Sequence, residues 1–224
     1  MIRTFLRANE GHREISMSNL LSDMDLAALI SSRICHDLIS PVGAIANGLE
    51  VLADNPDEEM RKVAVSLIEN SARQASSKLQ FARLAFGAAG SAGMEISLGD
   101  AGDLAQGLIA DDKRVTLDWR VPRENRPKAE VKLVLNLFTI ALTCIPRGGE
   151  ITVQADDSAF VLMAKGRKAC LPQRTAEVLT GETPASEIDA HRIQPYYTLR
   201  LIEETGFGLE IEQGEDEVVL RASR

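Results

Sequence analysis

The feature that most constrains the fold is a stripe of apolar side chains between residues 30 and 52. Its members stand three or four residues apart: Ile30, Ile34, Leu38, Val42, Ile45, Leu49 and Leu52. This spacing predicts a long α-helix with one apolar side, which begins near Asn19 to Asp25 and ends near Ala53. Turn residues follow at 54–57, and a second stripe predicts a second long helix that ends near Gly87. The second stripe consists of Val63, Leu67, Ala75, Leu79, Ala82 and Phe86.

A single helical hairpin cannot bury both of these stripes. Two copies of the hairpin that pack as a four-helix bundle would bury them, because each stripe then faces another helix. We therefore expect a homodimer.

The rest of the chain predicts a second domain of a different kind. Residues 1–18 show no period and are expected to form a loose leader, residues 19–90 the hairpin domain, and Gly87 to Gly93 a linker. Residues 94–224 mix strands and helices and predict an α/β sandwich with one helical layer. Expected strands are 94–97, 115–121, 150–155, 159–164, 209–212 and 217–222, and expected helices are 99–110, 129–145, 172–180 and 193–205.

One histidine lies on the side of the first helix opposite to its apolar stripe. At about 100° per residue, His36 falls roughly 180° from the centre of the stripe. The small or polar residues Ser32, Ser40, Gly43 and Asn47 share its face. His36 is therefore expected to be exposed and presented to a partner. Cys35 cannot act with it as a nucleophilic pair, because adjacent helical residues diverge.

Composition excludes several classes of function. The net charge of −8 argues against direct nucleic-acid binding, which requires a basic surface. No apolar run reaches membrane-spanning length, and the first residues lack the apolar core of a signal peptide, so a cytoplasmic protein is expected. The three cysteines fit reduced thiols and match no zinc spacing.

Two motifs resemble those of sensor histidine kinases. His36-Asp37-Leu38-Ile39-Ser40-Pro41 resembles the box that carries the phosphorylated histidine of a dimeric bundle. Leu135-Asn136-Leu137, Ala141, Pro146 and Gly148-Gly149 follow the frame of the box that binds nucleotide and Mg²⁺. The resemblance implies a degenerate kinase-like (Bergerat-type) α/β domain, because the nucleotide-binding residues have been lost.

The sequence departs from the kinase motifs at the positions where a kinase binds ATP. Ile140 stands where the kinases have the asparagine that holds Mg²⁺, and Thr143 replaces a lysine. Ala164 to Lys168 lacks the expected Asp-x-Gly-x-Gly pattern, and no glycine-rich lid precedes residue 193; Gly206 to Leu209 comes after that helix. A nucleotide site needs a metal ligand, a cation and backbone donors for the phosphates, so ATP is not expected to bind.

Together these features resemble the ChpT-type histidine phosphotransferases of alphaproteobacteria. The resemblance implies that His36 accepts a phosphoryl group from a receiver-domain aspartate and passes it to a second receiver. It implies a donor hybrid kinase of the CckA type and acceptors similar to CtrA and CpdR. It also implies no cofactor on this chain, with Mg²⁺ held by the receiver.

Neighbouring residues admit two interpretations each. Asp37 either orients or deprotonates His36, or only solvates the bundle surface. Arg33 either pairs with a phosphate or an acidic receiver residue, or is a solvated arginine. With Ser40, Gly43 and Asn47, Arg33 is a candidate for partner docking. Pro41 removes a backbone hydrogen bond to the Asp37 carbonyl and is expected to bend the helix.

The two other histidines and the single tryptophan receive no functional assignment. His12 and His191 fall in the leader and in a loop, and Trp119 is expected to be a packing residue. Two alternatives to the relay stay open: a divergent but active histidine kinase, and a non-catalytic scaffold.

Overall fold

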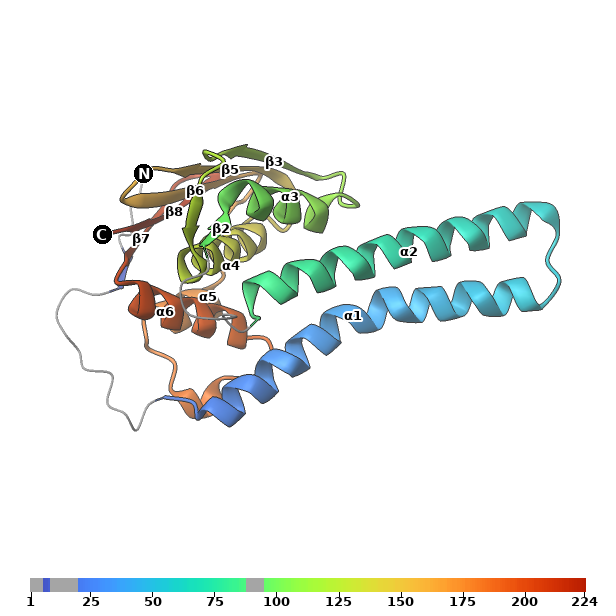
Figure 1. Cartoon of the computed structure of the whole chain (residues 1–224), viewed down its shortest axis with the longest axis horizontal. Helices are drawn as coiled ribbons and strands as arrows, with labels where there is room; N and C mark the ends of the chain where they lie inside the picture. The colour runs from blue at the N-terminus through green and yellow to red at the C-terminus, as the bar shows by residue number, and fades with distance from the viewer. Residues whose placement is uncertain (1–5, 9–19, 88–94) are drawn as a thin grey trace.

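The computed structural model describes residues 6–8, 20–87 and 95–224. A long helical hairpin projects from an α/β domain (Figure 1). The hairpin consists of α1 (Asp23–Ala53) and α2 (Glu58–Ala85). The expected extents of both helices are confirmed.

Side-chain caps fix where the two long helices begin. The hydroxyl of Ser22 accepts a hydrogen bond from the backbone N–H of Asp25, and the carboxylate of Asp57 accepts one from the N–H of Met60. Such caps satisfy donors that have no partner inside the helix. Acidic residues in both first turns also suit the positive end of the helix dipole.

The second domain has six strands in one sheet, in the order β1-β7-β8-β6-β5-β3. β3 and β5 are parallel, and the other neighbours are antiparallel. The strands are β1 (Leu6–Ala8), β3 (Val115–Arg120), β5 (Gly149–Ala155), β6 (Ala159–Lys165), β7 (Gly208–Gln213) and β8 (Glu217–Ser223). The predicted hairpin of β5 and β6 is confirmed; Asp156 accepts two backbone N–H groups in its turn.

One face of this sheet is covered by helices (Figure 1). The helices are α3 (Leu98–Ile109), α4 (Lys128–Cys144), α5 (Gln173–Leu179) and α6 (Ile193–Thr205), with a 3₁₀ turn at Ala185–Glu187. α4 is buried on almost every side, so its side chains form the centre of the core, as its nearly continuous apolar sequence predicts. The predicted sandwich with one helical layer is confirmed.

Two strand predictions need correction, whereas the strand predicted at 94–97 is confirmed over its described residues 95–97. Residues 1–18 are not all a loose leader, because β1 pairs antiparallel with β7. β2 (Glu95–Ser97) pairs with β4 (Asn125–Pro127), a strand that the sequence does not reveal. Each of these strands has three residues, too few to display an alternating pattern. The rest of the leader and most of the expected 87–93 linker lie outside the described residues.

Apolar contacts and a buried amide join the hairpin to the second domain. Leu21, Leu26, Leu29 and Ile30 of the first segment pack against Val178, Ile188, Ile193 and Tyr196. The backbone N–H of Leu21 also donates to the Tyr196 hydroxyl at 3.0 Å. At the end of α2, also at the base of the hairpin, the buried Asn136 donates to the carbonyl of Ala85, the last residue of α2. The beginning of α1 and the end of α2 are therefore both fixed to the α/β domain.

Two glycines of α1 give a matched test of the hairpin packing. A Cβ at Gly48 would lie 2.6 Å from Ile68 Cγ1, whereas a Cβ at Gly43 would meet no atom within 4 Å. Gly43→Ala should stabilise the protein by about 0.5–1 kcal/mol through helix propensity. Gly48→Ala should be less stable than Gly43→Ala by about 1–3 kcal/mol, because its methyl group forces the two helices apart. Urea unfolding at one protein concentration measures both, and equal stabilisation by the two substitutions would contradict this packing.

Candidate functional site

His36 lies near the middle of α1 on a face that is open to solvent. Its side chain is 65% exposed, as the helical periodicity predicts. Its Nδ1 lies 3.5 Å from Oδ1 of Asp37. A carboxylate at Nδ1 favours the tautomer with the proton on Nδ1, which leaves the lone pair on Nε2. His36 is thus an accessible imidazole with one nitrogen directed at a carboxylate.

Asp37 joins two other side chains of the same helix. Its Oδ2 accepts a hydrogen bond from Nε of Arg33 at 3.0 Å, and its Oδ1 faces His36. Both members of the Arg33–Asp37 pair are partly exposed, so the pair contributes little to stability and mainly fixes the direction of the carboxylate. Arg33 is therefore engaged within its own helix and is not a freely solvated cation.

Lys78 of α2 satisfies the carbonyl group that Pro41 leaves without its helical donor. Proline has no N–H, so the carbonyl of Asp37 loses the hydrogen bond expected from position 41. The ammonium group of Lys78 donates to this oxygen at 3.0 Å. α1 continues through Pro41, which is buried. Lys78 thereby fixes the backbone directly after His36, a role that sequence spacing gave no means to find.

The other predicted docking residues continue the exposed face of His36. Ser40, Gly43 and Asn47 are all exposed, one turn or more toward the tip of the hairpin. The open space around Gly43 leaves this part of α1 flat and accessible. The structure therefore places all the predicted docking positions except Arg33 on one accessible surface beside the histidine.

A second histidine lies next to His36. The ring of His191, in the segment that leads into α6, makes an edge-to-face contact with the ring of His36, with 5.6 Å between the ring centroids and 79° between their planes. The sequence assigned no function to His191. No local pattern could have revealed this contact, because it joins residues far apart in the chain through the packing of α1 on α6.

A cavity of about 280 Å³ lies behind Asp37, between the hairpin and the α/β domain. Arg33, Asp37 and Lys78 supply charged groups to its wall, and Thr139, Thr143 and Gln194 supply polar groups from the other domain. Gln194 donates to the backbone carbonyl of Asn136, so the polar wall is held by hydrogen bonds. This cavity separates the histidine-bearing helix from α4.

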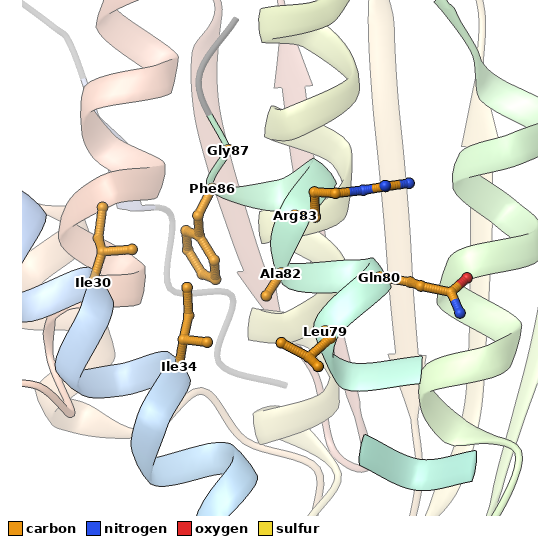
Figure 2. A pocket seen from close by; sticks show the side chains of 8 residues that line it. All are labelled: Ile30, Ile34, Leu79, Gln80, Ala82, Arg83, Phe86 and Gly87. Carbon is orange, nitrogen blue, oxygen red and sulfur yellow. The ribbon is translucent and has the colours of Figure 1, made fainter. Parts of the chain in front are cut away.

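A second hollow, of about 470 Å³, lies between the two helices of the hairpin. Figure 2 shows Ile30 and Ile34 of α1 facing Phe86 and Leu79 of α2 across it, whereas Arg83 and Gln80 point away. Its lining is almost entirely apolar.

The residues at the kinase nucleotide positions fill other structural roles. Ile140 is completely buried in the core. The hydroxyl of Thr143 donates to the backbone carbonyl of Ile140. In the segment that replaces Asp-x-Gly-x-Gly, the N–H of Gly166 donates to the carbonyl of Asp216, and that of Lys168 to its carboxylate. These backbone donors are thus committed to the neighbouring β7–β8 turn.

The cysteines form no disulfide with one another. Cys35 and Cys170 are exposed and Cys144 is buried, and all three are free thiols. Burial raises the pKa of Cys144 to about 12, so that thiol stays protonated. In the described part of the chain, no three histidine, cysteine or acidic side chains converge as a metal site would require. No helix within those same ranges is long and apolar enough to span a membrane.

Comparison with known proteins identifies the class of protein. Residues 98–217 match the model of the histidine phosphotransferase C-terminal domain. A curated relative, the protein phosphotransferase ChpT of Brucella abortus (strain 2308), is 46% identical over 212 residues, which cover 93% of this chain and 100% of the relative. A solved structure of a bacterial phosphotransferase matches with a TM-score of 0.83 at 43% identity, covering 93% of this chain and 100% of its own. The chain belongs to the histidine phosphotransferase family and is a phosphotransferase of two-component signalling.

The hydrogen bond from Lys78 to Asp37 can be tested with a double-mutant cycle. Lys78→Met should lower the free energy of unfolding by about 1–2 kcal/mol, because it leaves a partly buried carbonyl without a donor. In a Pro41→Ala background the cost should fall markedly, because the N–H of the new alanine can donate to Asp37. Urea unfolding of the four proteins gives the coupling energy. An equal cost of Lys78→Met in both backgrounds would contradict the compensation.

Proposed function

We propose that this chain is a phosphorelay intermediate in which His36 accepts a phosphoryl group from a receiver aspartate and donates it to the aspartate of a second receiver. The observation that carries the proposal is the exposed imidazole of His36, which has Asp37 at Nδ1 and the accessible face of Ser40, Gly43 and Asn47 beside it. A receiver domain is itself a folded protein, so its acidic active site requires such an open, projecting surface.

The transfer proceeds by two displacements at phosphorus. In the first, the lone pair of His36 Nε2 forms a P–N bond, and the P–O bond to the donor aspartate breaks with its electrons remaining on that carboxylate. The imidazole then carries a positive charge, which the carboxylate of Asp37 offsets from the Nδ1 side. In the second, a carboxylate oxygen of the next receiver attacks phosphorus, the P–N bond breaks, and neutral His36 returns. Alignment and charge neutralisation supply most of the catalysis in such transfers.

Asp37 acts as the residue that orients the imidazole and fixes its tautomer. Arg33 holds the carboxylate of Asp37 in place from one side, and Lys78 fixes its backbone from the other. Mg²⁺ is supplied by the receiver, so the chain needs no cofactor of its own.

The chain does not phosphorylate itself from ATP under this proposal. The buried Ile140 cannot coordinate Mg²⁺, and Thr143 supplies no cation. The backbone donors after β6 are used by the β7–β8 turn. These features support a phosphotransferase that depends on a phosphorylated partner.

The proposed partners come from the resemblance of the sequence to ChpT-type histidine phosphotransferases. We propose a hybrid histidine kinase of the CckA type as donor and CtrA-like and CpdR-like response regulators as acceptors, in the cytoplasm. A role in cell-cycle regulation follows from those partners.

The chain acts as a homodimer. Val42 and Leu49 belong to the predicted apolar stripe of α1, yet they are 54% and 55% exposed in one copy. Large apolar side chains of α2, including Val63 and Leu79, are also exposed. An apolar surface of this extent supports burial against a second hairpin.

The relay is tested by offering two sources of labelled phosphate to the purified chain. Label should pass to the chain from a phosphorylated receiver but not from Mg-ATP, and His36→Ala should abolish it. Arg221→Ala serves as the control, because it removes an exposed side chain of β8 that lies outside the hairpin and its docking face. Label from ATP alone would establish the divergent kinase instead. If His36→Ala left every effect on the partners unchanged, the chain would be a scaffold.

The dimer is tested by placing a charge on the apolar face. Leu49→Asp should shift the protein from dimer to monomer in sedimentation equilibrium at micromolar concentration, because the carboxylate would be buried at the seam. Asn47→Asp adds the same charge to an exposed position nearby and should leave the dimer intact. A wild-type protein that sediments as a monomer would refute the bundle.

A further inference from the structure

The α/β domain brings a second imidazole to the phosphate-accepting histidine. His191 belongs to the family-matched domain, whereas His36 belongs to the hairpin, and their rings are in edge-to-face contact at 5.6 Å. His36 is still 65% exposed in this arrangement, so the contact covers one side of the ring and leaves access for a receiver.

The backbone around His191 is held in one conformation. Oδ1 of Asp189 accepts hydrogen bonds from the N–H groups of both His191 and Arg192 at 2.9 Å. The guanidinium of Arg192 donates to the backbone carbonyl of Glu187 at 3.0 Å. The next residue, Ile193, is fully buried and belongs to the cluster that packs on Leu26 and Leu29 of α1. The turn that carries His191 is therefore fixed relative to the helix that carries His36.

The charges around this pair are unevenly distributed. On α1, the guanidinium of Arg33 is paired with Asp37, whose other oxygen faces His36 Nδ1. In the turn, Arg192 lies 3.5 Å from a carboxylate oxygen of Glu187, and Asp189 is engaged by backbone N–H groups. A phosphoryl group on His36 would add about two negative charges at this point. Arg33 is oriented toward Asp37 through its Nε, and Arg192 toward Glu187 through one terminal nitrogen, whereas His191 touches the ring that receives the charge.

We propose that His191 is a second residue of the phosphotransfer site and that its ring N–H donates a hydrogen bond to a phosphoryl oxygen carried by His36. An imidazole keeps at least one N–H donor whether neutral or protonated. The hydrogen bond exists only after transfer, so it stabilises the phosphorylated chain relative to the phosphorylated receiver. The inference rests on the proposed role of His36, and it gives the α/β domain a direct part in the relay.

The proposal is tested by the equilibrium between phosphorylated chain and phosphorylated receiver. His191→Ala should lower the ratio of phospho-His36 to phospho-receiver about three- to ten-fold, the effect of losing one partly exposed hydrogen bond to a charged group. His191→Arg should restore the ratio, because guanidinium also donates to phosphate. Arg221→Ala removes an exposed side chain from β8, on the sheet face turned away from the helices, and should leave the ratio unchanged.

A measurement without any receiver separates this proposal from the relay itself. Phosphoramidate can phosphorylate the full chain on histidine, and nitrogen NMR then follows the imidazole resonances. Those of His191 should shift when His36 is phosphorylated and should not shift in His36→Ala. Unchanged resonances together with an unchanged ratio in His191→Ala would overturn the proposal. The proposal would also be overturned if His191→Ala lowered the ratio and His191→Arg did not restore it. Such a result would mean that the substitution acts by changing the shape of the turn. Failure of the relay would appear differently, as no transfer between receiver and wild-type chain.

Discussion

The packing of the first turns of α1 against α6 is the interaction on which the site depends. Leu26 and Leu29 bury their side chains with Ile193 and Tyr196, and the hydroxyl of Tyr196 accepts the backbone N–H of Leu21. This contact ties the histidine-bearing helix to the α/β domain. At the same base of the hairpin, Asn136 donates a hydrogen bond to the carbonyl of Ala85, the last residue of α2. With the start of α1 and the end of α2 both fixed, His36 has a defined position, and the tip of the hairpin projects away from the α/β domain (Figure 1).

Inside this frame, hydrogen bonds order the surroundings of His36, the proposed phosphoryl acceptor. The proline that follows it in the motif removes a helical hydrogen bond, and Lys78 of the neighbouring helix supplies the missing donor. Arg33 fixes the carboxylate that faces Nδ1. Ile140, which stands where the resemblance places a Mg²⁺-binding asparagine, is completely buried in the core. The α/β domain thus braces the hairpin and, as we propose, brings His191 to the site.

Periodicity and capping residues sufficed to predict the parts of the fold that are long and regular. The extents of α1 and α2, the exposure of His36 and the hairpin around Asp156 all follow from local patterns, because each depends on neighbours in sequence. The three-residue strands β1 and β4 escaped prediction because each is defined by backbone pairing to a distant segment. The contacts of His36 with His191, and of Lys78 with the Asp37 carbonyl, escaped it for the same reason. They arise only when helices from different parts of the chain pack together.

The most direct test of the central account is to locate the phosphoryl group after transfer from a phosphorylated receiver. Mass spectrometry of the intact chain and of its peptides, kept at neutral to alkaline pH to preserve the P–N bond, identifies the modified residue. The account predicts one phosphoryl group per chain, on His36, which disappears when an unphosphorylated second receiver is added. Phosphate found on another residue, or phosphate on His36 that no receiver can remove, would contradict a relay through this histidine.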